Sequence, residues 1–247
     1  MSGHSHYATI KRQKEAKDAQ KGQIFSKLAK EIAIAVKAGG PDPSANFKLR
    51  VAMDKARAAN MPKDNVERAI SSGSSIAANL EEAQYEGFGP SGIAVIVEAA
   101  TDNRNRTGQE IKNLFERAGG RLAGPGSVSF NFENKGLLLV EKSSDPQTQM
   151  LTLIDMGVED IEETDDGLEV YAPPEKLTEV RQKLEDGGFK IVSAELFLKP
   201  KSLQPVTDSS EAKKALNFLD SLEEQEDVQR VFTNIDVPDA VLSQVSQ

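Results

Sequence analysis

The sequence predicts an α+β protein: an N-terminal three-helix domain followed by two ferredoxin-like β-α-β-β-α-β domains, the second inserted into the first. Three observations predict this fold class. Apolar residues recur at helical spacing near the N-terminus, strand-like and helix-like segments alternate after it, and the last helix and strand complete the first β-α-β-β series. The chain has 247 residues, 38% of them hydrophobic, which is enough for two or three small cores.

The N-terminal region contains three expected helices. Residues 23–38 place Phe25, Leu28 and Ile32 on one helical face, and Gly39-Gly40-Pro41 ends that run. A second helix is expected to begin after Ser44 as its N-cap. A third opens at Pro62, which is tolerated in a first turn, and stops near Gly73.

The first α+β domain is expected to be discontinuous in sequence. Its elements are a strand at 92–100, a helix from an N-cap at Asp102 to about Ala118, strands at 121–123 and 127–132, a helix at 209–223 and a strand at 228–233. The inserted domain has strands at 136–141, 158–162, 168–171 and 190–198, and helices at 145–156 and 174–186. The predicted domains are therefore 1–75, 76–133 with 204–236, and 134–203, followed by a C-terminal tail at 237–247.

Positive charge is concentrated at the N-terminal end of an acidic chain. Residues 1–72 contain 14 Lys and Arg against 7 Asp and Glu, whereas the remainder contains 16 against 32. A basic arm on an acidic body favours a polyanionic partner, because clustered cations release counterions from phosphate arrays. The alternative is a solvated helical surface.

Composition excludes several classes of protein. The chain has no apolar run of about 18 residues and no apolar stretch typical of a signal peptide, so a cytoplasmic protein is expected. It has 0 Cys and only two histidines, His4 and His6, both in the tail. We therefore expect no metal, no cofactor, no small-molecule substrate and no enzymatic activity. The GxGxxG pattern of Gly87, Gly89 and Gly92 precedes a strand instead of following one, which favours a structural turn over a dinucleotide site.

The N-terminal tail is the first candidate nucleic-acid-binding segment. Tyr7 lies beside His4 and His6, and five cations follow: Lys11, Arg12, Lys14, Lys17 and Lys21. An aromatic ring among cations can stack on an exposed base while the cations contact phosphates. The alternative is that Tyr7 packs on the helical domain.

Arg104 and Arg106 form the second candidate. They follow the first predicted strand in the segment TDNRNRT, at the start of a helix, where backbone N–H groups and the helix dipole favour anions. The alternative is a capped turn whose arginines pair with acidic neighbours.

Several of these segments together resemble the YebC/PmpR family over essentially the full length. They are SGHSHYATIKRQKEAKDAQKGQIFSKLAKEI, AGGPDP, NMPKDNVERAI, YEGFGPSG, TDNRNRT and GPGSVSFNF. Members usually have Lys and Trp where His6 and Tyr7 stand here. The resemblance implies a helical domain and two α+β domains. It also implies nucleic-acid binding in gene expression, since members are described as DNA-binding transcriptional regulators, and others as mitochondrial translational activators or ribosome-linked factors that relieve stalling.

The residues favour RNA over DNA as the target. A DNA reader normally inserts a recognition helix into the major groove, but the third predicted helix mixes Lys63 and Arg68 with Asp64 and Glu67. A basic tail with one aromatic suits structured RNA with looped-out bases. We expect a ribosome- or RNA-associated translation factor, with basic ribosomal proteins as further partners for the acidic remainder. The alternative is a DNA-binding transcriptional regulator.

Overall fold

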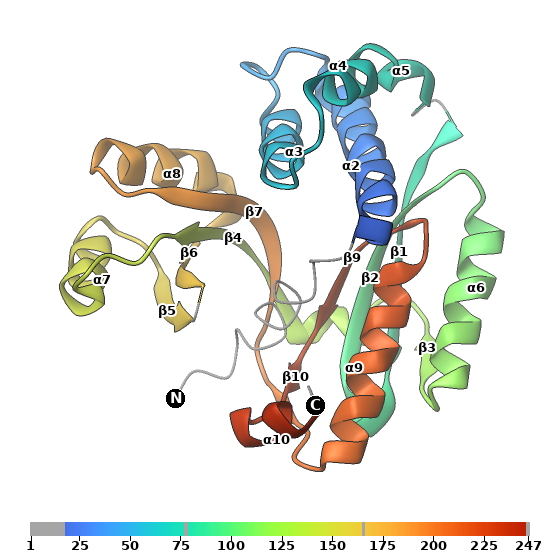
Figure 1. The fold of residues 1–247 in the computed structure, drawn as a ribbon. Coiled ribbons are helices and arrows are strands. Elements are labelled where there is room, and N and C mark those ends of the chain that lie inside the picture. Colours follow the sequence, from blue (N-terminus) through green and yellow to red (C-terminus); the bar gives the residue numbers. More distant parts are fainter. Residues whose placement is uncertain (1–17, 77–78, 165, 246–247) are drawn as a thin grey trace. The chain divides into compact units, whose positions relative to one another are not determined.

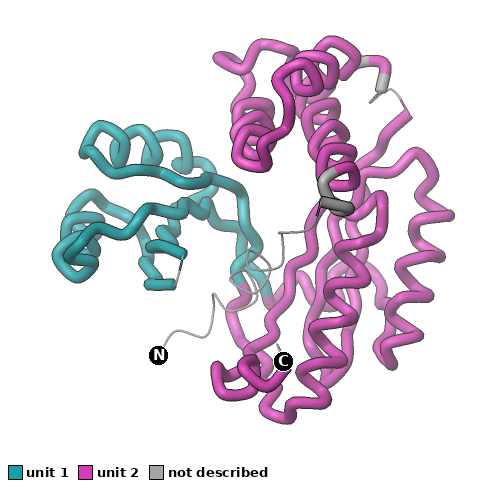
Figure 2. The backbone as a smooth tube through the Cα atoms, viewed as in Figure 1, with its two compact units in different colours: residues 1–14, 132–199 teal, residues 15–131, 200–247 magenta. Residues whose placement is uncertain are grey.

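The structure of the chain is a computed structural model that describes residues 18–76, 79–164 and 166–245 (Figure 1). It divides into two compact units (Figure 2). The smaller unit holds residues 132–199, and the larger holds residues 18–131 together with 200–245. Each unit contains its own four-stranded sheet. The α+β class, with N-terminal helices followed by two sheets, is confirmed.

The larger unit begins with the helices α2 (Asp18–Gly39), α3 (Phe47–Ala58), α4 (Lys63–Ser71) and the short α5 (Gly73–Ile76). Their shared core contains Leu28, Ile32 and Leu49, all buried. The three predicted helices are present, but the predicted N-cap at Ser44 is wrong. Asn46 caps α3 by accepting a hydrogen bond from Leu49 N at 3.1 Å, while its amide donates to Ala35 O, so it also ties α3 to α2.

The sheet of the larger unit has the strand order β3-β1-β2-β9. Its strands are β1 (Glu81–Phe88), β2 (Ala94–Thr101), β3 (Arg121–Ala123) and β9 (Val228–Thr233), and every pairing is antiparallel. Helices α6 (Arg104–Arg117) and α9 (Ser209–Glu224) pack on this sheet and on each other. The rings of Phe115 and Phe218 meet edge to face between them, with centroids 4.9 Å apart.

The predicted strand at 127–132 is wrong. Residues 129–131 form a 3-10 helix, η3 (Ser129–Asn131), and the backbone N–H groups of Gly126, Val128 and Ser129 donate to the buried carboxylate of Glu86. These donors are therefore not available to a neighbouring strand. The strand that fills this place in the sheet is β1, which precedes β2 in the chain and was not predicted. The order of elements is thus β-β-α-β before the insertion, not β-α-β-β.

The glycines of the GxGxxG pattern shape the β1–β2 hairpin. A Cβ on Gly87 would lie 2.6 Å from the backbone oxygen of Arg121, and Gly92 has a positive φ of 75° in the turn η2 (Pro90–Gly92). Both positions need glycine for backbone reasons. The prediction of a structural turn is confirmed.

The smaller unit has the strand order β5-β6-β4-β7, as a β-α-β-β-α-β series requires. Its core is built from buried leucines and valines, including Leu138, Leu153, Val170 and Leu184. The elements, in chain order, are β4 (Phe132–Val140), α7 (Pro146–Asp155), β5 (Asp160–Thr164), β6 (Gly167–Ala172), η4 (Pro174–Lys176), α8 (Leu177–Asp186) and β7 (Ile191–Pro200).

The chain leaves and re-enters the larger unit at adjacent points. Lys201 N donates to Asn131 O at 2.8 Å, and the Ser202 hydroxyl bonds the Asn131 side chain at 2.7 Å. Beyond them, β8 (Gln204–Pro205) pairs in parallel with β10 (Ile235–Asp236), and α10 (Asp239–Val245) occupies the predicted C-terminal tail.

Candidate nucleic-acid interface

The segment that carries Arg104 and Arg106 is a capped helix start. Asn103 is the N-cap of α6, and its side chain accepts from Arg106 N at 3.1 Å. Thr101, at the end of β2, accepts from Asn103 N at 2.9 Å and shares a hydrogen bond with Thr107 at 2.8 Å. The predicted N-cap at Asp102 is wrong, because its carboxylate binds the Arg106 side chain at 2.8 Å instead.

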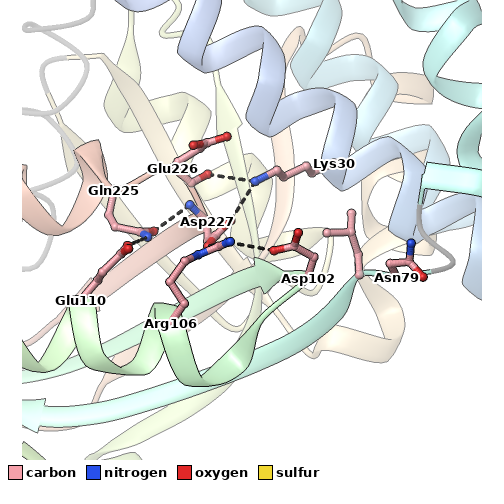
Figure 3. A pocket seen from close by; sticks show the side chains of 9 residues that line it. Lys30, Asn79, Asp102, Arg106, Glu110, Gln225, Glu226 and Asp227 are labelled. Carbon is pink, nitrogen blue, oxygen red and sulfur yellow. Dashed lines mark hydrogen bonds and ion pairs between the residues drawn. The ribbon is translucent and has the colours of Figure 1, made fainter.

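Asp227, just before β9, is the centre of a polar network beside this helix start (Figure 3). It is only 4% exposed. Its carboxylate accepts from Thr107 Oγ1 at 2.7 Å, from Lys30 Nζ at 2.9 Å and from Arg106 at 3.0 Å. Burial alone would raise the pKa of Asp227, but these three hydrogen bonds outweigh it and lower the pKa to about 2. The side chain is therefore an anion held by donors from α2 and α6.

The two predicted arginines, Arg104 and Arg106, have different environments. The Arg106 side chain is bound to Asp227 and Asp102, and these contacts raise its pKa. Arg104 is exposed, and its guanidinium makes no ion pair with any carboxylate in the described part of the chain. The alternative in which the arginines pair with acidic neighbours therefore applies to Arg106. Arg104 stays a candidate for a phosphate contact.

A cavity of about 630 Å³ lies over this network. Four carboxylates line it but only two cations, so its charge does not favour a phosphate. Its other lining residues are two amides and one leucine, and Gln225 donates to Glu110 at 2.7 Å across one wall. The complete lining is Lys30, Asn79, Leu80, Asp102, Arg106, Glu110, Gln225, Glu226 and Asp227.

One glutamine and two lysines of α2 donate to backbone carbonyls at and just after the C-terminal end of α9. Gln23 donates to Glu224 O at 2.7 Å, Lys27 donates to Glu223 O, and Lys30 reaches Glu226 O at 3.4 Å. Carbonyls at a helix C-terminus lack intrahelical partners and carry the negative end of the dipole, so lysines stabilise them. Part of the basic excess of residues 1–72 is thus used inside the molecule.

The tail candidates lie outside the described residues. These are His4, His6, Tyr7, Lys11, Arg12, Lys14 and Lys17, and their role remains a prediction. Lys21 lies within α2.

The third predicted helix, α4, offers little to a DNA major groove. Its exposed charged side chains are two cations and two acids, and Lys63 pairs with Glu67 at 3.4 Å. Helices α3 and α4 each pack mainly on α2, whereas the two helices of a helix-turn-helix pack on one another. This arrangement does not favour α4 as a recognition helix.

We also looked among the described residues for a metal site and for a membrane-spanning helix. Within 18–76, 79–164 and 166–245, no group of three or more His, Cys, Asp or Glu is placed to hold a metal ion. In the same residues, no helix is both long and apolar enough to cross a membrane.

The salt dependence of nucleic-acid binding should distinguish the role of Arg104 from that of Arg106. We expect Arg104→Ala to lower the slope of log affinity against log salt by about one, as loss of one phosphate contact does. Arg106→Ala should leave that slope unchanged and instead lower the melting temperature, because it leaves Asp227 with one donor fewer. Fluorescence anisotropy over a salt series and thermal unfolding check the pair. An unchanged slope for Arg104→Ala would remove Arg104 from the interface.

Comparison with known proteins gives matches over almost the whole chain. Residues 5–76 match the TACO1/YebC protein N-terminal domain, and residues 80–235 match the TACO1/YebC second and third domain. A probable transcriptional regulatory protein of Dictyoglomus turgidum is 45% identical over 100% of both chains. One of the same name from Lactiplantibacillus plantarum is 44% identical over 97% of this chain and 100% of its own. The crystal structure of a conserved hypothetical protein from Aquifex aeolicus has a TM-score of 0.84 and 42% identity, covering 92% of this chain and 95% of that one.

Proposed function

Since the chain belongs to the TACO1/YebC family, we propose that it is a nucleic-acid-binding regulator of gene expression that acts on RNA. In this proposal it is a cytoplasmic translation factor associated with the ribosome, and it catalyses no reaction. The names of its relatives, as probable transcriptional regulatory proteins, support a regulatory role.

The observation that carries the proposal is the concentration of positive charge beside one aromatic residue in the N-terminal sequence. In the larger unit, many cations already bind a carbonyl or carboxylate of the chain: Lys27, Lys30, Lys55, Arg57, Lys63 and Arg106. Residues 8–17 contain four cations and one acid in sequence, next to Tyr7. A short basic segment with one aromatic suits RNA loops, whose unstacked bases are accessible.

DNA-binding transcriptional regulation is the second candidate, and the names of the relatives favour it. Such a regulator would need a recognition helix for the major groove. Helix α4 carries two acids beside its two cations, so its charge does not favour that role. The acidic remainder of the chain suits a basic protein surface, such as that of a ribosomal protein, better than a duplex.

A direct comparison of ligands tests the proposal. The full chain is titrated, at matched salt, into a labelled RNA hairpin with an unpaired loop and into a DNA duplex of the same stem sequence. We expect the RNA to bind about ten-fold more tightly, the effect of one stacked base. A lysate separated on a sucrose gradient should place the protein with ribosomal subunits. Tighter binding to the duplex, with no protein in the ribosomal fractions, would favour the transcriptional alternative, and binding to neither ligand would refute both.

A further inference from the structure

Phe130 presents an aromatic ring to solvent from the loop at residues 124–131. The ring lies in η3 and is 72% exposed, more than any other large apolar side chain in the described residues. Its neighbour in the loop, Val128, is only 1% exposed. The loop at 124–131 is therefore anchored by one apolar side chain and displays the other.

The buried carboxylate of Glu86 binds the backbone of this loop. The carboxylate is 5% exposed and accepts from the N–H groups of Gly126, Val128 and Ser129, each at 2.9 Å. Burial alone would raise the pKa of Glu86, but the backbone hydrogen bonds outweigh it and lower the pKa. The carboxylate is ionised at neutral pH, and three fixed donors offset its charge.

Lys201 also binds the backbone at Phe130 and Asn131. Lys201 Nζ donates to Phe130 O at 2.8 Å, and Lys201 N donates to Asn131 O at 2.8 Å. A ring on a backbone fixed in this way loses little conformational entropy when a ligand stacks on it.

The chain segments next to Phe130 in the larger unit contain no acid, and the one carboxylate that contacts the loop, that of Glu86, is buried and offset by its three backbone donors. These segments are residues 120–131 and 200–207, which are joined by the hydrogen bonds of Lys201 to Phe130 O and Asn131 O. They contain Arg121 and Lys201, both exposed. A polyanion therefore meets no repulsion from these segments, and a basic protein gains no attraction.

We infer that Phe130 is a stacking platform for an unpaired base of RNA. The ammonium group of Lys201, one of whose three donors binds Phe130 O, lies beside it for the adjoining phosphate. Every base offers a π-face to an aromatic ring, whereas paired bases in a duplex are already stacked. The inference rests on the proposed RNA-binding function and adds a second contact, separate in sequence from the N-terminal tail.

Phe130→Ala should weaken binding of a labelled oligouridine by about five- to hundred-fold, the range for loss of one stacked base. Phe130→Tyr should retain the affinity. The melting temperature should not change in either variant, because the side chain is mostly exposed. The matched control is Leu151→Ala on α7, a side chain that is 65% exposed.

Tryptophan gives a direct reading of stacking. The chain has 0 Trp, so Phe130→Trp introduces a single indole fluorophore. Oligouridine should quench its emission, and added salt should restore it, whereas the emission of a Leu151→Trp control should not change. Equal quenching at both positions, or quenching at neither while anisotropy still shows oligouridine binding to the full chain, overturns this inference and leaves the proposed function standing. No RNA binding by the full chain overturns both.

Discussion

Asp227→Ala is expected to lower the free energy of unfolding of the larger unit by about 3 kcal/mol, the scale for breaking a buried ion pair. The substitution leaves Lys30, Arg106 and Thr107 without their common acceptor. It also removes the ion pair between α2 and the residue that precedes β9. Urea unfolding followed by circular dichroism measures the loss.

Acid provides an independent test of the same carboxylate. Because the pKa of Asp227 is lowered from 3.8 to about 2, its contribution is fully present above pH 4 and is lost as the pH falls toward 2. The wild type should lose stability in that window more steeply than Asp227→Asn, which cannot ionise. The control is Asp102→Ala, whose carboxylate is more than half exposed and pairs only with Arg106 among the described contacts. Equal losses for Asp102→Ala and Asp227→Ala would contradict the central role of Asp227.

Deleting residues 1–17 is expected to remove most of the affinity for RNA. The deletion takes away Lys11, Arg12, Lys14 and Lys17 and leaves α2 whole, since that helix begins at Asp18. If each cation contacts one phosphate, the slope of log affinity against log salt should fall by about 3, at roughly 0.7 per single-stranded phosphate. Anisotropy titrations of the RNA hairpin over a salt series measure this slope.

The matched control neutralises four cations on the acidic part of the chain. Lys176, Lys183, Lys213 and Lys214 are all exposed, and their replacement by Gln makes the same change in net charge as the four tail cations replaced by Gln. If both quadruple variants lose affinity and slope equally, general charge explains the binding and the tail has no special role.

The smaller unit could be predicted from the sequence almost completely, and the larger unit only in part. Residues 228–233 are rich in β-branched and aromatic residues and match β9. Strand β1, in contrast, begins with two glutamates and ends in Gly87 and Phe88, so its sequence resembles a linker. The alternation of Val128, Phe130 and Phe132 imitates a strand, but Glu86 takes the N–H groups that a strand would use. The local sequence pattern cannot reveal that the Glu86 carboxylate competes with a neighbouring strand for these N–H groups, because Glu86 is distant in sequence.

The site could be predicted only in outline. The segment TDNRNRT does begin a helix, as its polar residues and position after a strand indicate. The fate of Arg106, however, depends on Asp227, which lies 121 positions further along the chain. An acidic run such as Glu223 to Asp227 is typical of a solvated surface, and only the fold shows that α2 neutralises its end.

The Asn131–Lys201 hydrogen bond joins the two points at which the chain leaves and re-enters the larger unit. Before residues 132–199 fold, pairing β9 with β2 must close a loop that contains the whole insertion, and the entropy cost of closure grows with the logarithm of loop length. Once β4 and β7 are neighbours in their own sheet, those two points are held together and the loop is shorter by that entire segment. The inserted unit therefore acts as a cross-link during folding, and assembly of its sheet favours the arrival of β9 at β2.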